Sequence, residues 1–290
     1  MQTDKSIKEL FHNRHGFLAT MHKKETAISP ILQKELGIEI IIPNEFNTDA
    51  FGTFTNEVER DGDQLHAARR KIEKGMAQTG LQIGISSEGS FGPHPMVPFL
   101  PFNRELVLFV DKALDLEITG FIANSKTNYK QAMIESFDEA YGFADSIGFP
   151  DHGVILKTTS STTNSSEIIK GITDIEQLKT AINSLFRKSP KSLYIETDMR
   201  AMYNPTRMKN IELATLDLVN KIKTTCPNCS MPGYEVVKAN KGLKCEYCSC
   251  PTDLILSHIY FCKKCEYKEE KMYPNGNKTA DPSRCPLCNP

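Results

Sequence analysis

The chain has almost no net charge, which limits the partners that it could attract over a distance. It contains 35 Lys and Arg residues against 36 Asp and Glu residues, a formal net charge of −1. A chain this close to neutrality creates no whole-molecule field for nucleic acid or an anionic membrane. The composition, 39% hydrophobic and 24% charged, is typical of a globular chain with one large domain or two modest ones.

Long apolar segments are also missing. The first residues lack the apolar run of a signal peptide. The longest uncharged stretch, residues 89–103, contains four prolines and therefore cannot form a membrane-spanning helix. The Gly-x-Ser-x-Gly motif of one hydrolase class is absent as well. We expect a cytoplasmic protein with no membrane partner.

Cysteine is absent before Cys226, and all nine cysteines lie from that position onward. Eight of them form four Cys-x-x-Cys pairs, which in a reducing compartment bind metal more often than they form disulfides. The spacing predicts two zinc ribbons, each made from two consecutive pairs and each holding one structural zinc ion. The expected ligand sets are Cys226, Cys229, Cys245 and Cys248 for the first ribbon and Cys262, Cys265, Cys285 and Cys288 for the second. We therefore divide the chain into a domain over 1–223 and a metal-binding tail over 224–290.

The charge of this tail disfavours nucleic acid as its partner. The tail carries nine Lys and Arg against seven Asp and Glu, a formal +2, and eight thiolates on two Zn²⁺ ions add −4, which gives −2. A surface that follows phosphates is normally basic. Six Tyr and Phe side chains could stack on bases or fill the small cores that ribbons need. A structural role or a protein contact is favoured, and nucleic-acid binding stays open.

The pattern ahead of the tail predicts an α/β domain with a mixed, twisted sheet flanked by helices. A strand over 15–21, a helix that ends near Leu36 and a β-branched strand over 38–43 indicate a right-handed crossover. Asp63 and Gly80 are expected to cap the next helix. Further strands are predicted over 81–85, 105–111, 116–123, 153–157 and 192–197, and further helices over 136–147, 174–187 and from Pro205 onward.

Three stretches of this domain carry side chains suited to a phosphorylated ligand. The turn after the first strand contributes Thr20 and Lys24, where N–H groups at a helix start attract anions. The helix after Asp63 presents His66 and Arg70 on one face, with Arg69 beside them. A glycine-rich loop after the strand at 81–85 carries a carboxylate suited to Mg²⁺, Glu88. The neighbours of that carboxylate with ligand-binding potential are Ser87, Gly89, Ser90 and His94.

A fourth stretch follows the strand at 192–197. Glu196 and Asp198 point to the same side if the strand continues, and Arg200 and Arg207 come shortly after. Two carboxylates and two arginines are costly to bury unless they are paired or used. All four stretches have structural alternatives, such as solvated lysines, an exposed charged face, a tight turn or an ion-pair cluster.

Several motifs resemble a bacterial family described only as a domain of unknown function. The motifs are Phe-Gly-Thr-Phe-Thr at 51–55, Ser-Glu-Gly-Ser-Phe-Gly-Pro-His-Pro at 87–95, Glu-Thr-Asp-Met-Arg at 196–200, Tyr-Asn-Pro-Thr-Arg-Met at 203–208, and the closing cysteine pairs. The resemblance covers nearly the whole chain and implies no activity.

The first 125 residues also resemble, more distantly, the inosine triphosphate pyrophosphatase-like superfamily, which hydrolyses non-canonical nucleoside triphosphates to monophosphates. Residues 19–25 are similar to its Ala-Thr-x-Asn-x-x-Lys motif, with His22 in place of asparagine and the lysine one position early. Residues 67–72 are similar to its Asn-Ala-x-x-Lys-Ala motif without the asparagine, and Glu88 corresponds to its acidic turn. The second half and the cysteine tail depart from that superfamily.

We therefore expect a Mg²⁺-dependent hydrolase or binder of a phosphorylated ligand, and a nucleoside triphosphate is the expected ligand. The expected catalytic residues are Glu88, Lys71, Asp198 and Glu196, and the expected ligand-binding residues are Thr20, Lys24, Arg69, Ser87, Gly89, Ser90, His94, Arg200 and Arg207. The alternative is a zinc-ribbon adaptor for nucleic acid or protein, whose α/β domain senses a ligand without catalysis. The substrate and the oligomeric state stay open.

Overall fold

The computed structural model describes residues 2–43, 63–189 and 191–290. Lys8–Val219 form one compact unit, and Met1–Ile7 with Asn220–Pro290 form a second. The division falls within helix α6 (Pro205–Lys223), close to the boundary predicted at 223. The motif at 51–55 lies outside the described residues. None of the helices in the described part of the chain is long and apolar enough to cross a membrane.

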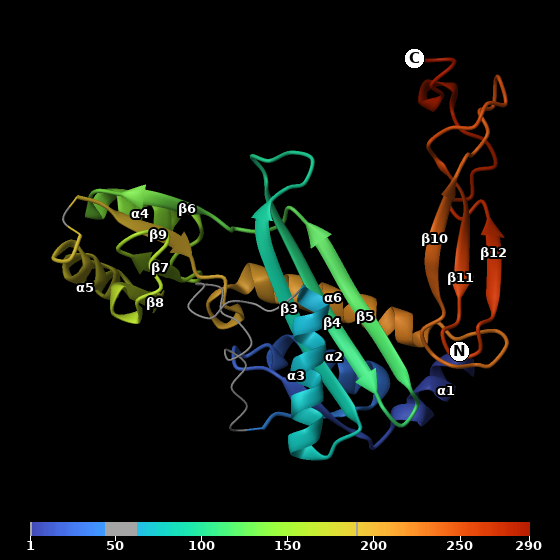
Figure 1. Cartoon of the computed structure of the whole chain (residues 1–290), viewed down its shortest axis with the longest axis horizontal. Helices are drawn as coiled ribbons and strands as arrows, with labels where there is room; N and C mark the ends of the chain where they lie inside the picture. Colours follow the sequence, from blue (N-terminus) through green and yellow to red (C-terminus); the bar gives the residue numbers. More distant parts are fainter. Residues whose placement is uncertain (1, 44–62, 190) are drawn as a thin grey trace. The chain divides into compact units, whose positions relative to one another are not determined.

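A five-stranded mixed sheet forms the centre of the larger unit, which confirms the predicted α/β fold (Figure 1). The strand order is β2-β1-β3-β4-β5; β1 is parallel to β2 and β3, whereas β3, β4 and β5 are antiparallel neighbours. The strands are β1 (His15–Ala19), β2 (Glu39–Ile41), β3 (Ile83–Pro93), β4 (Pro101–Asp111) and β5 (Leu116–Asn124). The parallel pair β1 and β2 is joined through helix α2 (Glu25–Leu36), as the predicted crossover requires.

Helices cover both faces of this sheet. Helix α3 (Gln64–Thr79) packs over β3, where Gly84 leaves room for Ile72, since a Cβ there would lie 2.5 Å from that side chain. Helix α6 packs on the opposite face, where Gly120 of β5 touches the backbone of Ala214. Helix α1 (Gln2–Phe11) precedes β1.

The capping signals of α3 and α6 were predicted correctly. The Asp63 carboxylate accepts a hydrogen bond from the His66 N–H at 2.8 Å, and Gly80 ends α3 at a φ of 70°. The Asn204 side chain accepts from the Arg207 N–H at 2.9 Å. These bonds satisfy backbone groups that the first turn of a helix leaves without partners.

The prediction of a glycine-rich loop after residue 85 is wrong. Strand β3 continues to Pro93 and pairs with β4 without a break, from Ile83 opposite Asp111 to Pro93 opposite Pro101. At Gly84 and Gly89, large side chains from other elements occupy the space that a larger residue would need. Gly89 shows this directly, since a Cβ there would lie 2.6 Å from both Arg207 and Glu105.

A second, four-stranded sheet in the same unit was not predicted as a separate sheet. Its order is β6-β9-β7-β8, and every pairing is antiparallel. The elements are β6 (Gln131–Ile134), α4 (Phe137–Ser146), β7 (Val154–Lys157), β8 (Ile168–Ile172), α5 (Ile175–Phe186) and β9 (Leu193–Thr197). Apolar side chains of α4 and α5 form one buried core with this sheet. Strands β6 and β8 were not predicted, because they are short and partly exposed.

The smaller unit contains a three-stranded antiparallel sheet in the order β10-β11-β12. The strands are β10 (Glu235–Lys241), β11 (Ile255–Phe261) and β12 (Lys268–Met272). Each of the four Cys-x-x-Cys pairs lies outside these strands, in the turns at their ends. The cysteines therefore gather where the strands begin and end.

Candidate functional site

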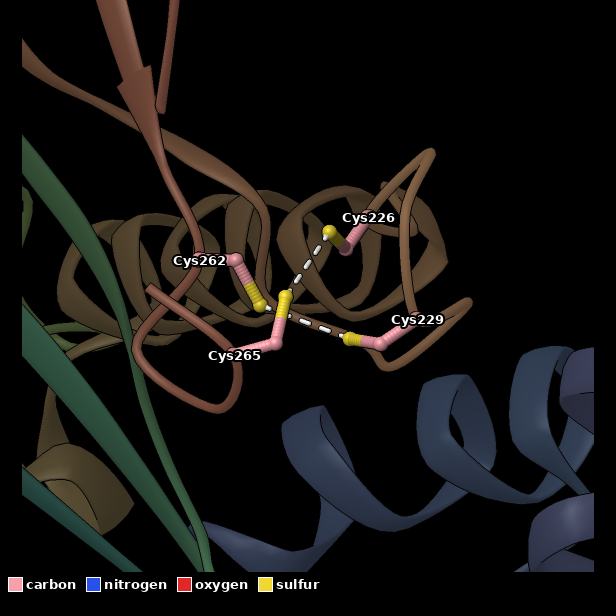
Figure 2. A group of neighbouring side chains, drawn as sticks. All are labelled: Cys226, Cys229, Cys262 and Cys265. Atoms are coloured by element: carbon pink, nitrogen blue, oxygen red, sulfur yellow. Dashed lines mark hydrogen bonds between the residues drawn. The ribbon is translucent and has the colours of Figure 1, made fainter. Parts of the chain in front are cut away.

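Eight cysteines form two groups of four in the smaller unit, and each group could hold a metal ion. In the first group (Figure 2), Cys226 Sγ lies 3.7 Å from Cys265 Sγ, and Cys229 Sγ lies 3.7 Å from Cys262 Sγ. The matching distances in the second group are 3.9 and 3.5 Å. A tetrahedral zinc site with Zn–S bonds of ~2.3 Å has sulfur–sulfur edges of about 3.8 Å. The geometry of both groups therefore fits zinc and a zinc-ribbon-like tail.

The pairing predicted from consecutive spacing is wrong. The first group combines Cys226 and Cys229 with Cys262 and Cys265, and the second combines Cys245 and Cys248 with Cys285 and Cys288. The antiparallel sheet explains this arrangement. Strand β10 carries the chain from the first pair to the second, β11 returns it to the first, and β12 takes it back. Alternate pairs therefore meet at the same end of the sheet.

All four pairs adopt the same turn, as expected of four equivalent metal-binding knuckles. In each pair, the N–H four residues after the first cysteine donates to the carbonyl of that cysteine. The donors are Ser230 (2.8 Å), Ser249 (3.0 Å), Glu266 (2.8 Å) and Asn289 (2.9 Å). Cys250, the ninth cysteine, belongs to neither group.

A second candidate site lies in the larger unit, where five charged side chains are buried together. We call Lys24, Lys71, Glu88, Glu105 and Arg207 the charge cluster; each is at most 7% exposed. Lys71 Nζ lies 2.5 Å from Glu88 Oε1, and Arg207 Nε lies 2.8 Å from Glu105 Oε1. Within the described part of the chain, these three cations and two carboxylates have a formal charge of +1 if all five groups are ionised.

The end of β1 explains the position of Lys24. Strand β1 pairs with β3 only as far as Ala19 opposite Ser86, whereas β3 continues. Lys24, at the start of α2, donates to the Ser87 carbonyl at 2.5 Å. The lysine therefore occupies the edge that β3 exposes beyond the carboxyl end of β1, a position where α/β sheets usually bind ligands.

The two ion pairs of the charge cluster lie on opposite faces of the sheet. Glu105 is opposite Gly89 in the β3–β4 register, and Glu88 is opposite Leu106. Directly opposed residues in an antiparallel pair share a face, and successive residues alternate. Lys24 lies at the edge between the two pairs. Burial, with Coulombic repulsion from Arg207 next in importance, lowers the pKa of Lys24 to about 7.

Several buried polar atoms around the charge cluster have no hydrogen-bond partner among the described residues. They are Ser86 Oγ, Ser87 Oγ, both amide atoms of the Asn103 side chain, and Glu105 Oε2. Buried polar atoms are normally satisfied, because each unsatisfied group costs about 1–3 kcal/mol. Such atoms are candidates for contacts with a ligand.

The structure brings together six of the residues selected from sequence: Lys24, Lys71, Ser87, Glu88, Gly89 and Arg207. Sequence reasoning missed Asn103 and Glu105, although they share a face of β4 with the apolar residues Val107 and Phe109. The signal that could have identified Glu105 is a charged residue on the apolar face of a strand. Such a residue needs a buried partner of opposite charge.

The other predicted residues have different surroundings. Thr20 is buried, and its hydroxyl accepts weakly from the His22 N–H at 3.4 Å. Ser90 is partly buried on β3, and the His94 ring accepts from the Met96 N–H at 3.1 Å. Arg69 makes an exposed ion pair with Glu117 of β5 at 2.6 Å.

The carboxylates at the end of β9 have their own cations. Glu196 lies 2.8 Å from Lys157, and burial raises the pKa of Glu196. Asp198 binds Arg200 at 2.6 Å and accepts from the Gly171 N–H. Among the described residues, cysteines alone supply a group of three or more metal-binding side chains, so Glu196, Asp198 and Glu88 do not form one.

Fold and sites together define a class: an α/β domain followed by a tail with two interleaved four-cysteine groups. The chain belongs to the family described as Domain of unknown function (DUF6671), whose model matches residues 71–290. The match includes Lys71, Glu88, Arg207 and all eight grouped cysteines. A comparison with curated proteins found no significant match.

Proposed function

We propose that the larger unit binds a phosphorylated small molecule at the charge cluster, and that a nucleoside triphosphate is its ligand. The observation that carries this proposal is the burial of three cations with two carboxylates among the residues that the structure describes. Burial makes an excess positive charge costly, and an anion would offset that cost. Phosphate oxygens accept several charge-assisted hydrogen bonds, for which lysine and arginine are suitable donors.

The unsatisfied polar atoms support the same proposal. A phosphate at the β3 edge would lie near Lys24 and could accept from the Ser87 hydroxyl. Bound phosphate would favour the protonated form of Lys24 and so raise its lowered pKa. Glu88 is the carboxylate that we propose for Mg²⁺ delivered with the nucleotide, where the ion would neutralise charge during hydrolysis of a phosphoanhydride bond. The two cysteine groups would hold structural zinc, as expected for a protein of the reducing cytoplasm.

A binding and turnover assay tests this proposal. The protein is incubated with pooled nucleoside triphosphates and Mg²⁺, and thermal shift and phosphate or pyrophosphate release are measured. Lys24→Met is expected to abolish both signals, because it removes the cation whose bond in the structure is to a backbone carbonyl. Lys34→Met is the matched control, since Lys34 lies on the same helix with 83% of its side chain exposed. Neither a thermal shift nor release with the unaltered protein would refute the proposal.

One observation favours a second function, an adaptor role for the tail. Tyr247 is 85% exposed and Leu287 is 66% exposed, and both lie inside Cys-x-x-Cys turns of the second cysteine group. Two exposed apolar side chains at one end of a small sheet suit a contact with a protein partner. The double variant Tyr247→Ala, Leu287→Ala is expected to lose a partner captured by the tail while keeping its metal content. Equal capture by the variant and the unaltered protein would argue against this role.

A further inference from the structure

A cleft of about 650 Å³ lies in the larger unit, next to the end of β3 at Gly92 and Pro93. We call it the hairpin cleft. Its walls are the end of β3, the hairpin residues 98–101, the segment 127–131, and the end of α4 at Ser146 and Ile147. Its volume falls within the range of about 300–1,000 Å³ that is usual for small-molecule sites.

The two walls of the hairpin cleft differ in chemistry. The hairpin wall is apolar and contains Phe99, which is 85% exposed, and Leu100, which is 42% exposed. Another part of the lining is polar and contains Tyr129 and Gln131. Gln131 Oε1 accepts from the Tyr129 hydroxyl at 3.3 Å and from the Tyr194 hydroxyl at 2.5 Å, which fixes the amide and leaves its NH₂ group as a donor. Aromatic walls with one oriented amide suit a flat heteroaromatic ring that carries hydrogen-bond acceptors.

The ring of Phe91 contacts both Tyr129, which lines the cleft, and Arg207 of the charge cluster. The Arg207 guanidinium lies 5.2 Å from the centre of the Phe91 ring. The Tyr129 ring stacks on Phe91 with centroids 6.2 Å apart and an interplanar angle of 27°. Tyr129 is therefore within about 11 Å of Arg207, which is the scale of a nucleotide extended from its base to its phosphates.

We infer that the hairpin cleft binds the base of the nucleotide whose phosphates occupy the charge cluster; this inference rests on the proposed function. Phe99 and Tyr129 would contact the faces of the base, and Gln131 would donate to its edge. The lack of cover over Phe99 suits this role, because a bound base would shield an aromatic side chain that is now in water.

Titration calorimetry with two kinds of ligand tests the inference. The ligands are inorganic tripolyphosphate and, separately, ATP, GTP, CTP, UTP and ITP, each with Mg²⁺. At least one nucleotide is expected to bind about tenfold more tightly than tripolyphosphate, the contribution typical of stacking one base. Phe99→Ala should remove this tenfold gain and leave tripolyphosphate binding unchanged. Met96→Ala is the matched control and should change neither affinity, because Met96 is 83% exposed in the same hairpin but does not line the cleft.

The outcomes distinguish a failure of the base site from a failure of the phosphate site. If Phe99→Ala binds nucleotides as tightly as the unaltered protein while tripolyphosphate still binds, the charge cluster keeps its role and the base site is refuted. If neither tripolyphosphate nor any nucleotide binds the unaltered protein, both are refuted. A change in sedimentation with no change in nucleotide affinity would assign Phe99 to contacts between proteins and also overturn the inference. Because Phe99 is exposed, its replacement is expected to leave folding intact.

Discussion

Replacing Gly89 by alanine should destabilise the larger unit by inserting one methyl group into the charge cluster. The new Cβ would lie 2.6 Å from Arg207 Nη2 and 2.6 Å from Glu105 Oε1, well inside the ~3.5 Å at which nonbonded heavy atoms are comfortable. Neither side chain has an easy way to move. Both are fully buried, and Arg207 Nη1 is also bonded to the Met199 carbonyl at 2.5 Å. Overpacking of this kind costs about 1–3 kcal/mol, and opening the ion pair would bring the cost to roughly 3–5 kcal/mol.

Urea unfolding followed by circular dichroism measures this effect, since the chain has no tryptophan for fluorescence. Gly92→Ala is the control, because Gly92 lies on the same strand and a Cβ there would have no heavy atom within 4 Å. The control should change stability by less than about 0.5 kcal/mol. Equal unfolding midpoints for the two variants would mean that Arg207 and Glu105 are not packed against β3 as described.

Other perturbations separate the two sites. The double variant Cys226→Ser, Cys262→Ser should lose one of two metal ions, because both cysteines belong to the first group. The double variant Cys226→Ser, Cys245→Ser should bind both ions more weakly, because it removes one ligand from each group. Metal analysis after mild chelation measures both effects, and the reverse result would support the pairing predicted from consecutive spacing. Because burial lowers the pKa of Lys24 to about 7 from an ordinary 10.5, the unfolded chain binds more protons between these values, and stability should gain up to about 1.4 kcal/mol per pH unit as pH rises through this window. Urea unfolding at pH 7 and pH 9 should show this gain reduced in Lys24→Met, and equal gains would contradict it. Lys71→Met should cost about 3–5 kcal/mol by leaving a buried carboxylate without its cation, and a loss below 1 kcal/mol in the same assay would show that the pair is solvated.

Local signals in the sequence were sufficient to predict most helices and several strands. Asp63 and Gly80 mark the ends of α3, and Asn204 followed by Pro205 marks the start of α6. Capping depends on bonds within one turn, so the residues that determine it lie close together in the chain.

Features that depend on distant segments were harder to predict. The composition of residues 84–95 suggested a loop because small residues are also the residues that make room for buried side chains. The partner that fills the space beside Gly89 comes from α6, more than a hundred residues later, and its position is visible only in three dimensions. The grouping of the cysteines likewise depends on strand direction, which the Cys-x-x-Cys spacing does not encode.

The interleaved grouping of the cysteines determines when each metal site becomes complete during synthesis of the tail. The site that contains Cys226 is incomplete until Cys265, 39 residues later, has been synthesised. The site that contains Cys245 likewise requires Cys288, 43 residues later. A nascent chain that ends before Cys265 therefore contains two knuckles and no complete metal site. Binding of the first ion closes the loop that contains β10 and β11. This closure lowers the entropic cost of bringing the cysteines of the second group together. The second ion should therefore bind faster to a tail that already holds the first than to an empty one, although each group keeps its own four ligands.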